Sequence, residues 1–206
     1  MLTIWGRLTS VNVQKVVLAA DELGLPYQRR EAGGAHGIVG TPAYRAMNPN
    51  GQVPVIEEDG FVLWESNAIV RYLAAKHGEG GLWPREPRAR ADADRWMDWQ
   101  TTEWTPGMRD AFWNLVRTPP ERRDAAALKA SFEASEARAA ILDAHLAGRR
   151  FVAGDALTMG DIALLCAAHR WLNLPAERVD RPHLRRWYEA LMARPSARAT
   201  LLLPIA

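Results

Sequence analysis

A short hairpin pattern that runs directly into a helix constrains this sequence more than any other feature. Val53–Glu57 and Phe61–Trp64 are rich in β-branched and aromatic residues, and Asp59-Gly60 between them is a typical hairpin turn. The spacing of apolar residues then becomes helical, so we expect Ser66 to cap a helix that runs to Lys76. Such a helix start offers a hydroxyl and free backbone amides, which suit a bound carboxylate.

Val53-Pro54 stands at the start of the first of these strands. A proline there removes one donor from the strand ladder and raises the frequency of a cis peptide bond above the non-proline background. The preceding Asn48-Pro-Asn-Gly51 is an ordinary turn sequence. The pattern therefore predicts an exposed backbone edge at Val53, beside the N-terminus of the Ser66 helix.

Strand and helix patterns alternate upstream of the hairpin. We expect strands at residues 2–5 and 27–31, helices at residues 11–23 and 41–47, and a glycine-rich loop at residues 33–40. This β-α-β order followed by β-β-α predicts a small mixed sheet flanked by helices.

The pattern changes after Gly78, and residues 78–84 have the composition of a linker. Pro87 fits the first turn of the next helix. From there only a 3.6-residue periodicity occurs, which predicts an all-helical second domain. Helices are expected at residues 91–116, with a kink or break at Pro106-Gly107, and at 121–146, 158–172, 182–192 and 197–203.

Thr158 and Asp161 have the spacing of a helix-capping box, with Asp instead of Glu or Gln at its last position. We interpret Asp161 as a structural cap whose removal costs about 0.5–2 kcal/mol, and not as a catalytic acid. Cys166, the single cysteine, lies on the apolar stripe of the same predicted helix and is expected to be an inert core thiol. One cysteine excludes an intramolecular disulfide and any CxxC site.

The ordered set of Asn48 to Pro54 followed by Glu65-Ser66 resembles the glutathione S-transferase family, and the resemblance extends from Leu2 to the region of Pro204. It implies an α/β plus all-α fold. A thioredoxin-like, glutathione-binding domain is expected at residues 1–78, and a helical-bundle domain that contributes the electrophile pocket at residues 87–206. It also implies glutathione as co-substrate and a homodimer, with the helices after Pro87 and from Ser66 in the interface.

By this resemblance, Gln52 and the backbone of Val53 contact the glutathione backbone. Glu65 and Ser66 bind the γ-glutamyl ammonium and carboxylate; the alternative is a plain capping pair. His36 lies near the place where the family has a basic residue for the glycyl carboxylate. The glycines around it match neither GxGxxG nor GxxxxGK[ST], so the loop is not predicted to bind a nucleotide.

Transferase chemistry needs a glutathione thiolate at neutral pH. A free thiol has a pKa of about 8.5, which donors at a helix N-terminus lower to roughly 3.5–7.5. Ser10 and Asn12 flank the start of the first predicted helix and are the candidate catalytic donors, although Ser10 could only cap the helix. Residues 1–26 hold no Tyr or Cys, which excludes the Tyr- and Cys-type chemistries of the family. Arg7 could hold the thiolate or an anionic second substrate, or be a solvated charge.

The candidates for the electrophile pocket lie on the long predicted helix. The alternative for each is packing in the core or in a dimer. They are Trp104, Met108, Arg109 and Phe112.

Composition excludes several classes of protein. With 206 residues the chain can form one large or two small domains, and 26 basic against 24 acidic residues argue against a nucleic-acid partner or a polybasic membrane surface. The apolar run at residues 162–168 is too short to span a bilayer. The N-terminus shows no signal-peptide pattern, and the five histidines show no metal spacing, so we expect a cytoplasmic protein without a metal.

Three functions therefore compete. The first is addition of the glutathione thiolate to a small electrophile. The second, on the same site, is glutathione-dependent disulfide reduction or dehalogenation. The third is a non-catalytic interaction module with this fold, against which the complete set of ligand residues argues.

Overall fold

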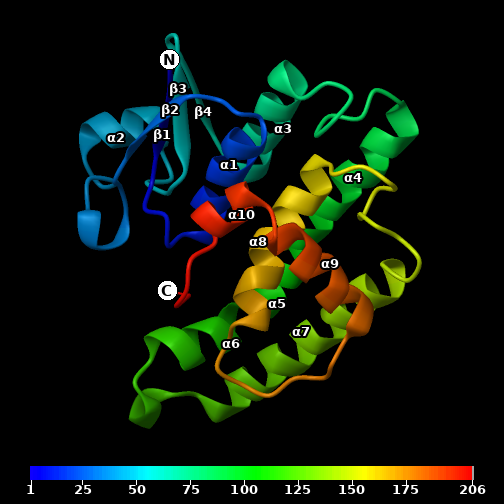
Figure 1. The fold of residues 1–206 in the computed structure, drawn as a ribbon. Coiled ribbons are helices and arrows are strands. Elements are labelled where there is room, and N and C mark those ends of the chain that lie inside the picture. Colours follow the sequence, from blue (N-terminus) through cyan, green and yellow to red (C-terminus); the bar gives the residue numbers. More distant parts are fainter. Residues whose placement is uncertain (206) are drawn as a thin grey trace. The chain divides into compact units, whose positions relative to one another are not determined.

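The computed structural model describes residues 1–205 and divides the chain into two compact units, Met1–Arg85 and a second unit that begins at Glu86 (Figure 1). The first contains all four strands and the second is built from helices, so the predicted fold class is confirmed. Each unit is described by itself.

The first unit is built on a four-stranded sheet with the order β2-β1-β3-β4. The strands are β1 (Leu2–Trp5), β2 (Tyr27–Arg30), β3 (Val55–Glu58) and β4 (Phe61–Trp64). β1 pairs parallel with β2 and antiparallel with β3, and β3 pairs antiparallel with β4. A helical crossover connects the parallel strands β1 and β2, and a tight turn connects the antiparallel strands β3 and β4. The result is the mixed sheet that the sequence predicts.

Helices cover both faces of this sheet. α1 (Val11–Glu22) and α3 (Ser66–His77) pack together, and α2 (Pro42–Met47) lies on the opposite side of the sheet (Figure 1). The neighbouring residues Val55 and Ile56 of β3 are both 0% exposed. Since adjacent residues of a strand point to opposite faces, both faces of the sheet carry a core.

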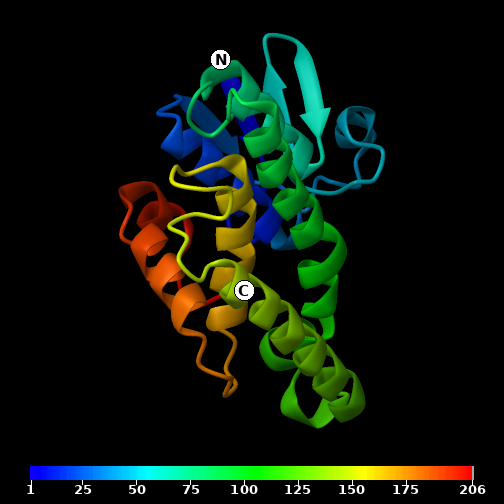
Figure 2. The ribbon, with the colours of Figure 1, turned by 90° about the vertical axis from the view of Figure 1, so that its right-hand side faces the viewer.

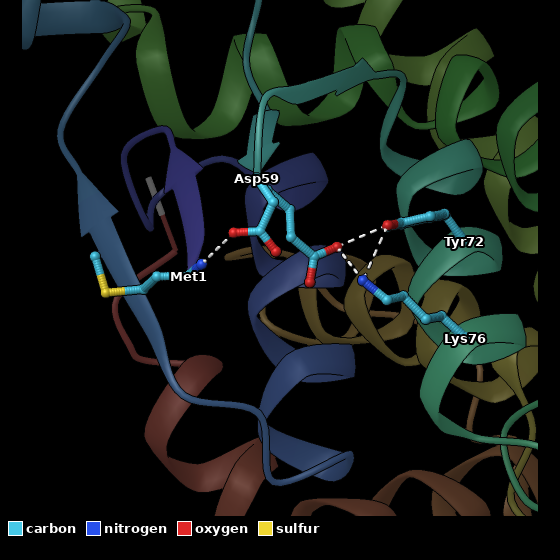
Figure 3. Close-up of polar contacts among 5 residues, drawn as sticks. Met1, Asp59, Tyr72 and Lys76 are labelled. Atoms are coloured by element: carbon cyan, nitrogen blue, oxygen red, sulfur yellow. Dashed lines mark hydrogen bonds and ion pairs between the residues drawn. The ribbon is translucent and has the colours of Figure 1, made fainter.

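Polar contacts fasten the β3–β4 turn at two points. The N-terminal ammonium of Met1 donates to Oδ1 of Asp59 at 2.9 Å. On α3, the Tyr72 hydroxyl donates to Oε2 of Glu58 at 2.7 Å, and the Lys76 ammonium lies 2.8 Å from the same oxygen. Figure 3 shows Tyr72 and Lys76 reaching from α3 toward this turn. The hairpin is therefore tied both to the chain start and to the helix that follows it.

The second unit opens with a long, irregular helical path from Pro87 to Arg117, drawn in green in Figure 2. It consists of α4 (Pro87–Trp99), a π-helical stretch, α5 (Thr105–Gly107), α6 (Arg109–Phe112) and a second π-helical stretch. The break between α5 and α6 follows Pro106-Gly107, as predicted. The extra residues of the π-helical turns have no signature in the sequence pattern.

The remaining helices pack around a buried one. They are α7 (Ala125–His145), α8 (Met159–Leu172), α9 (Pro182–Met192) and α10 (Pro195–Thr200). α8 contacts α4 and α9 and is buried on nearly all sides, including Cys166 at 0% exposure.

Asp161 begins this central helix and is completely buried. Its carboxylate accepts hydrogen bonds from the backbone N–H of Val152 and of Thr158, both at 3.0 Å, from the Thr158 hydroxyl at 3.1 Å and from Nε1 of Trp187 at 3.0 Å. The predicted capping box is present, and Asp161 also joins a loop and α9 to the start of α8.

Several predicted element boundaries differ from the structure; the helix expected from residue 91, for example, already begins at Pro87. Three of the differences have a clear local reason. β3 starts at Val55 and not at Val53, because Pro54 cannot donate to the ladder. α7 starts at Ala125, four residues late, where the Asp124 carboxylate accepts from the backbone N–H of Ala126 and Ala127 at 3.0 and 2.9 Å. α10 spans Pro195–Thr200 and does not reach residue 203, since a residue before a proline disfavours the helical conformation.

Candidate functional site

A polar cavity of about 260 Å³ lies in the first unit at the N-terminal end of α1. Three segments line it: the loop after β1 with the first turn of α1, the glycine-rich loop after β2, and the turn before Pro54. The lining residues are Arg7, Ser10, Asn12, Gly33, Gly34, Val39, Gly51, Gln52 and Val53. Five of the predicted site residues are thus brought together: Arg7, Ser10, Asn12, Gln52 and Val53.

Ser10 occupies the N-cap position of α1, with extended backbone angles (φ −84°, ψ 122°). Its hydroxyl makes no capping hydrogen bond in the described part of the chain. Asn12 is the second residue of the helix, so its amide and the Ser10 hydroxyl stand where the backbone N–H groups of the first turn are also exposed. This end of α1 carries no acidic residue in its first turn, so the positive end of its dipole is not offset there.

Arg7 lies across the glycine-rich loop. Its backbone N–H donates to the carbonyl of Ala32 at 3.0 Å, which joins the two loops. A Cβ on Gly33 would lie 3.0 Å from the Arg7 side chain, and one on Gly34 would lie 3.1 Å from it. Glycine at both positions therefore leaves room for the Arg7 side chain. Arg7 therefore adds a fixed positive charge to the wall of the cavity.

The turn before Pro54 is held by two donors on one carbonyl. The Tyr44 hydroxyl and Nδ2 of Asn48 donate to the carbonyl oxygen of Gln52 at 3.0 and 2.9 Å. Burial raises the pKa of Tyr44 to about 12, so this hydroxyl stays protonated at neutral pH. The Val53-Pro54 peptide is cis, and Val53 precedes the ladder, which begins with the pair of Trp5 and Val55. The backbone of Val53 is thereby presented at the cavity.

Polar residues also gather at the N-terminus of α3, in the same unit. Glu65 is exposed at the N-cap and has φ +72°, a backbone conformation that residues other than glycine rarely adopt. Ser66 is 6% exposed. The Lys15 ammonium of α1, 1% exposed, donates to Oδ1 of Asn67 at 3.2 Å and to Oγ of Ser66 at 3.5 Å. Glu65 and Ser66 are not among the residues that line the 260 Å³ cavity.

The other predicted residues lie elsewhere. His36 is exposed and stands 3.5 Å from the carboxylate of Glu31. In the second unit, Trp104, Met108 and Phe112 are nearly completely buried, at 0%, 1% and 3% exposure, whereas Arg109 is exposed. Their predicted role in binding an electrophile stays a prediction.

The cavity is suited to an anionic or thiol-bearing ligand. A guanidinium, a hydroxyl, side-chain amides and a helix N-terminus surround it, and all of them donate hydrogen bonds. Within residues 1–205 there is no cluster of three or more His, Cys, Asp or Glu side chains that could hold a metal ion. None of the described helices is long and apolar enough to cross a membrane.

Family models match both units. Residues 9–76 match the glutathione S-transferase N-terminal domain and residues 104–195 the C-terminal domain. The chain belongs to the glutathione S-transferase family.

Relatives agree with this assignment over the whole length. The chain is 44% identical to glutathione S-transferase GstB of Escherichia coli, with 100% of both chains covered. It is 31% identical to glutathione S-transferase 3 of Zea mays, covering 97% of this chain and 93% of the relative. A theta class glutathione S-transferase from Xanthomonas axonopodis pv. citri, solved with glutathione bound, superposes with a TM-score of 0.96 at 45% identity, covering 100% and 99% of the two chains.

Tyr44 and Lys15 were not predicted from the sequence, and Asn48 and Gly51 were named only as parts of a turn, without the roles that the structure gives them. Gly51 has φ +61°, and a Cβ there would lie 2.9 Å from the carbonyl oxygen of Val39. Tyr44 and Asn48 act through a backbone carbonyl, and Lys15 lies inside a helix whose other buried residues are apolar. A lysine in the middle of that apolar stripe is the one signal in the sequence that could have pointed to a buried cation.

Proposed function

We propose that this chain binds glutathione in the first-unit cavity and transfers its thiolate to a small electrophile. The observation that carries the proposal is the cavity at the N-terminus of α1, where the Ser10 hydroxyl makes no cap. Membership of the family and the glutathione-bound structure of a relative at 45% identity support it.

The Ser10 hydroxyl and the Asn12 amide are proposed to donate hydrogen bonds to the glutathione sulfur. Donors and the positive end of the α1 dipole favour the thiolate over the thiol, so they lower the pKa of the bound thiol. The thiol proton leaves to solvent. The sulfur lone pair then forms a bond to the electrophile, while a leaving group departs with its electron pair or, in an addition, the opened π bond or ring takes up a proton from solvent. The Arg7 guanidinium adds positive potential to the same cavity.

The remaining contacts orient the tripeptide. The turn at Gln52 and the backbone of Val53 pair with its central part, and the two donors on the Gln52 carbonyl keep this turn in place. The γ-glutamyl carboxylate binds at the N-terminus of α3 through Ser66, and its ammonium binds Glu65. His36 is retained as a candidate for the glycyl carboxylate, and Trp104, Met108, Arg109 and Phe112 as candidates for the electrophile.

Two alternatives use other observations. Disulfide reduction and dehalogenation need the same thiolate and no protein cysteine, which fits a chain whose only thiol, Cys166, is buried. An interaction module is favoured by one relative: probable elongation factor 1-gamma 2 of Arabidopsis thaliana is 28% identical, and the match covers 91% of this chain but 46% of that protein. The donor-lined cavity argues for the enzyme.

We also propose a cytoplasmic homodimer, with α4 and α3 in the interface. Membership of the family supports this proposal.

Activity with a panel of substrates tests the proposed function. Wild-type protein is assayed with glutathione and halogenated aromatic, epoxide, α,β-unsaturated carbonyl and disulfide substrates. We expect turnover of at least one class that is saturable in glutathione. Binding of glutathione without turnover of any class would favour the interaction module, and turnover of disulfides alone would favour the reductase.

A further inference from the structure

Tyr44 and Asn48 are not among the residues that line the cavity at the start of α1, yet both hold a peptide group in its wall. They are 2% and 3% exposed, and their side chains donate to the carbonyl oxygen of Gln52 at 3.0 and 2.9 Å. A carbonyl oxygen has two lone pairs, so these two donors occupy both. Two buried side chains therefore determine the direction of a peptide group at the edge of the cavity.

The orientation of the Asn48 amide follows from its partners. Its Oδ1 lies 3.0 Å from the backbone nitrogen of Asn50 and 3.2 Å from Nδ2 of Asn50, and both of these nitrogens only donate. The carbonyl of Gln52 only accepts, so it faces the NH₂ group of Asn48. Burial raises the pKa of Tyr44 to about 12, which keeps its hydroxyl protonated at neutral pH. Both side chains are therefore fixed as donors toward Gln52.

The direction of the Gln52 carbonyl determines the direction of the next N–H. The bond between Gln52 and Val53 is trans, and in a trans peptide group the C=O and the N–H point in opposite directions. Because the carbonyl points toward the buried Tyr44 and Asn48, the Val53 N–H points away from them. Within residues 1–205, neither the N–H nor the C=O of Val53 has a hydrogen-bond partner. A residue that lines the cavity thus has a free donor and a free acceptor on its backbone.

The side chain of Val53 is held by the core. It packs against the buried cluster of Ala32, Tyr44 and Val55, so its backbone is fixed from the inside. A residue before proline favours the extended conformation. The N–H and C=O of an extended residue match the C=O and N–H of one residue in a peptide that lies beside it. The wall of the cavity is therefore suited to the backbone of a bound peptide.

We propose that Tyr44 and Asn48 are positioning residues for glutathione, which aim the Val53 N–H at the cysteinyl carbonyl and so select a ligand with an amide at that position. This inference rests on the proposed function, because the ligand is glutathione in the first-unit cavity. Both residues act through the Gln52 carbonyl and touch no ligand themselves. Removal of either donor lets the peptide group between Gln52 and Val53 rotate, and the Val53 N–H then no longer faces the ligand in part of the molecules.

Calorimetric titration with two ligands tests the proposal. The first is glutathione. The second is an analogue in which an (E)-alkene replaces the cysteinyl–glycine amide, so that the shape is kept and the carbonyl acceptor is removed. For Tyr44→Phe we expect glutathione affinity to fall about three- to tenfold, as for one neutral hydrogen bond. Affinity for the alkene analogue should change less than about twofold, since it offers the Val53 N–H no acceptor.

Asn48→Asp changes the same carbonyl from its other side. The aspartate keeps an acceptor for the backbone N–H of Asn50 but places an oxygen against the Gln52 carbonyl, where the two repel each other. Glutathione affinity should therefore fall at least about tenfold, again with little change for the alkene analogue. Tyr44→Phe should then cost less in the Asn48→Asp background than in the wild type, because the peptide group has already turned.

Two matched substitutions separate this role from a purely structural one. Tyr27→Phe removes a hydroxyl of the same unit that donates to Oδ1 of Asp21, also at 3.0 Å. Asn114→Asp changes an amide of the second unit that donates to the Asp110 carbonyl at 2.8 Å and accepts from the backbone N–H of Asp124 at 2.7 Å. Both should lower stability and leave the ratio of the two ligand affinities unchanged.

The Val53 amide gives a readout that needs no variant. Its hydrogen exchange in the wild type should slow at least about tenfold at saturating glutathione, and not with the alkene analogue. In Tyr44→Phe, KM for glutathione should rise. The kcat at saturating glutathione and the pKa of the bound thiol should stay unchanged, since Ser10 and Asn12 are the proposed donors to the sulfur.

The outcomes distinguish this inference from the proposed function. Equal losses for both ligands in Tyr44→Phe and Asn48→Asp, or a Val53 amide that glutathione does not protect, would overturn the inference while glutathione binding by the wild type stands. Should Asn48→Asp fail to fold, Tyr44→Phe and the exchange of the Val53 amide decide the question. Failure of the wild type to bind glutathione at all would overturn the proposed function as well.

Discussion

We propose that the residues at the start of α1 set the pKa of the bound glutathione thiol. Ser10→Ala and Asn12→Ala should each remove one donor and raise the pKa of bound glutathione, and each unit of pKa equals 1.36 kcal/mol of lost preference for the thiolate. We expect activity at neutral pH to fall more than glutathione affinity, with partial recovery at alkaline pH. The ultraviolet absorbance of the bound thiolate, titrated against pH, measures this. An unmoved titration in both variants would assign the two residues to capping alone.

Asp161 should matter more for stability than a helix cap at the surface. The sequence suggested a cost of about 0.5–2 kcal/mol, but Asp161 is fully buried and accepts from three N–H groups and a hydroxyl. Burial raises the pKa of this carboxyl, and the hydrogen bonds from Val152 and Trp187 act in the opposite direction. Asp161→Ala leaves buried donors without an acceptor, so we expect a loss of about 3 kcal/mol or more in the free energy of unfolding. Urea denaturation checks this; a loss below about 1 kcal/mol would mean that water replaces the carboxylate.

Site residues at strand ends and helix starts could be predicted from the sequence, whereas buried polar roles could not. Arg7, Ser10, Asn12 and Gln52 follow recognisable strand ends and helix starts, and the cavity brings them together. Tyr44 bonds to Gln52, which is 8 residues away in the sequence, and Lys15 bonds to Ser66, which is 51 residues away. Their partners depend on how α1, α2 and α3 pack, which a local pattern does not contain.

At the scale of elements, the hairpin and α3 are coupled through Glu58. Hydrogen bonds from Lys76 and Tyr72 lower the pKa of Glu58. A carboxyl with a lower pKa in the folded state contributes stability that is complete above its unfolded pKa, about 4.3, and is lost as the pH falls through the folded value. Glu58→Gln should therefore reduce the free energy of unfolding by about 0.2–1 kcal/mol at pH 7, given that Lys76 is exposed, and by less in acid.

Denaturation of wild type and Glu58→Gln at pH 7 and near pH 3 measures this difference. Glu133→Gln is the control, because its exposed pair with Lys129 is 3.9 Å long and should contribute little at either pH. A Glu58→Gln effect that grows toward acid pH would contradict the account.

Element types followed from the sequence better than element ends did. Every predicted strand and helix occurs, because the period of apolar residues changes from two to 3.6 where the structure changes. The starts of β3 and α7 and the end of α10 were misplaced. Each is set by a single residue, a proline or a capping aspartate, which the apolar period does not show. The π-helical turns at residues 100–104 and 113–117 could not be predicted, because the apolar pattern of the sequence hardly changes there.

At the scale of the molecule, the proposed homodimer can be measured directly. The monomer has a mass of 23.0 kDa, so sedimentation equilibrium at micromolar concentration should give twice that value. Substitutions on the exposed sides of α3 and α4 should shift the equilibrium toward the monomer. A mass of 23.0 kDa for the wild type would contradict the proposal without affecting the site in the first unit.

Calorimetric titration of the wild type and of Gln52→Trp tests whether the cavity at the N-terminus of α1 binds glutathione. Gln52 is exposed and lines the cavity, so a tryptophan there should fill it without unfolding the unit. We expect the wild type to bind one glutathione per chain and Gln52→Trp to bind at least about tenfold more weakly, a difference of roughly 1.4 kcal/mol. No binding by the wild type, or equal binding by both proteins, would contradict the account.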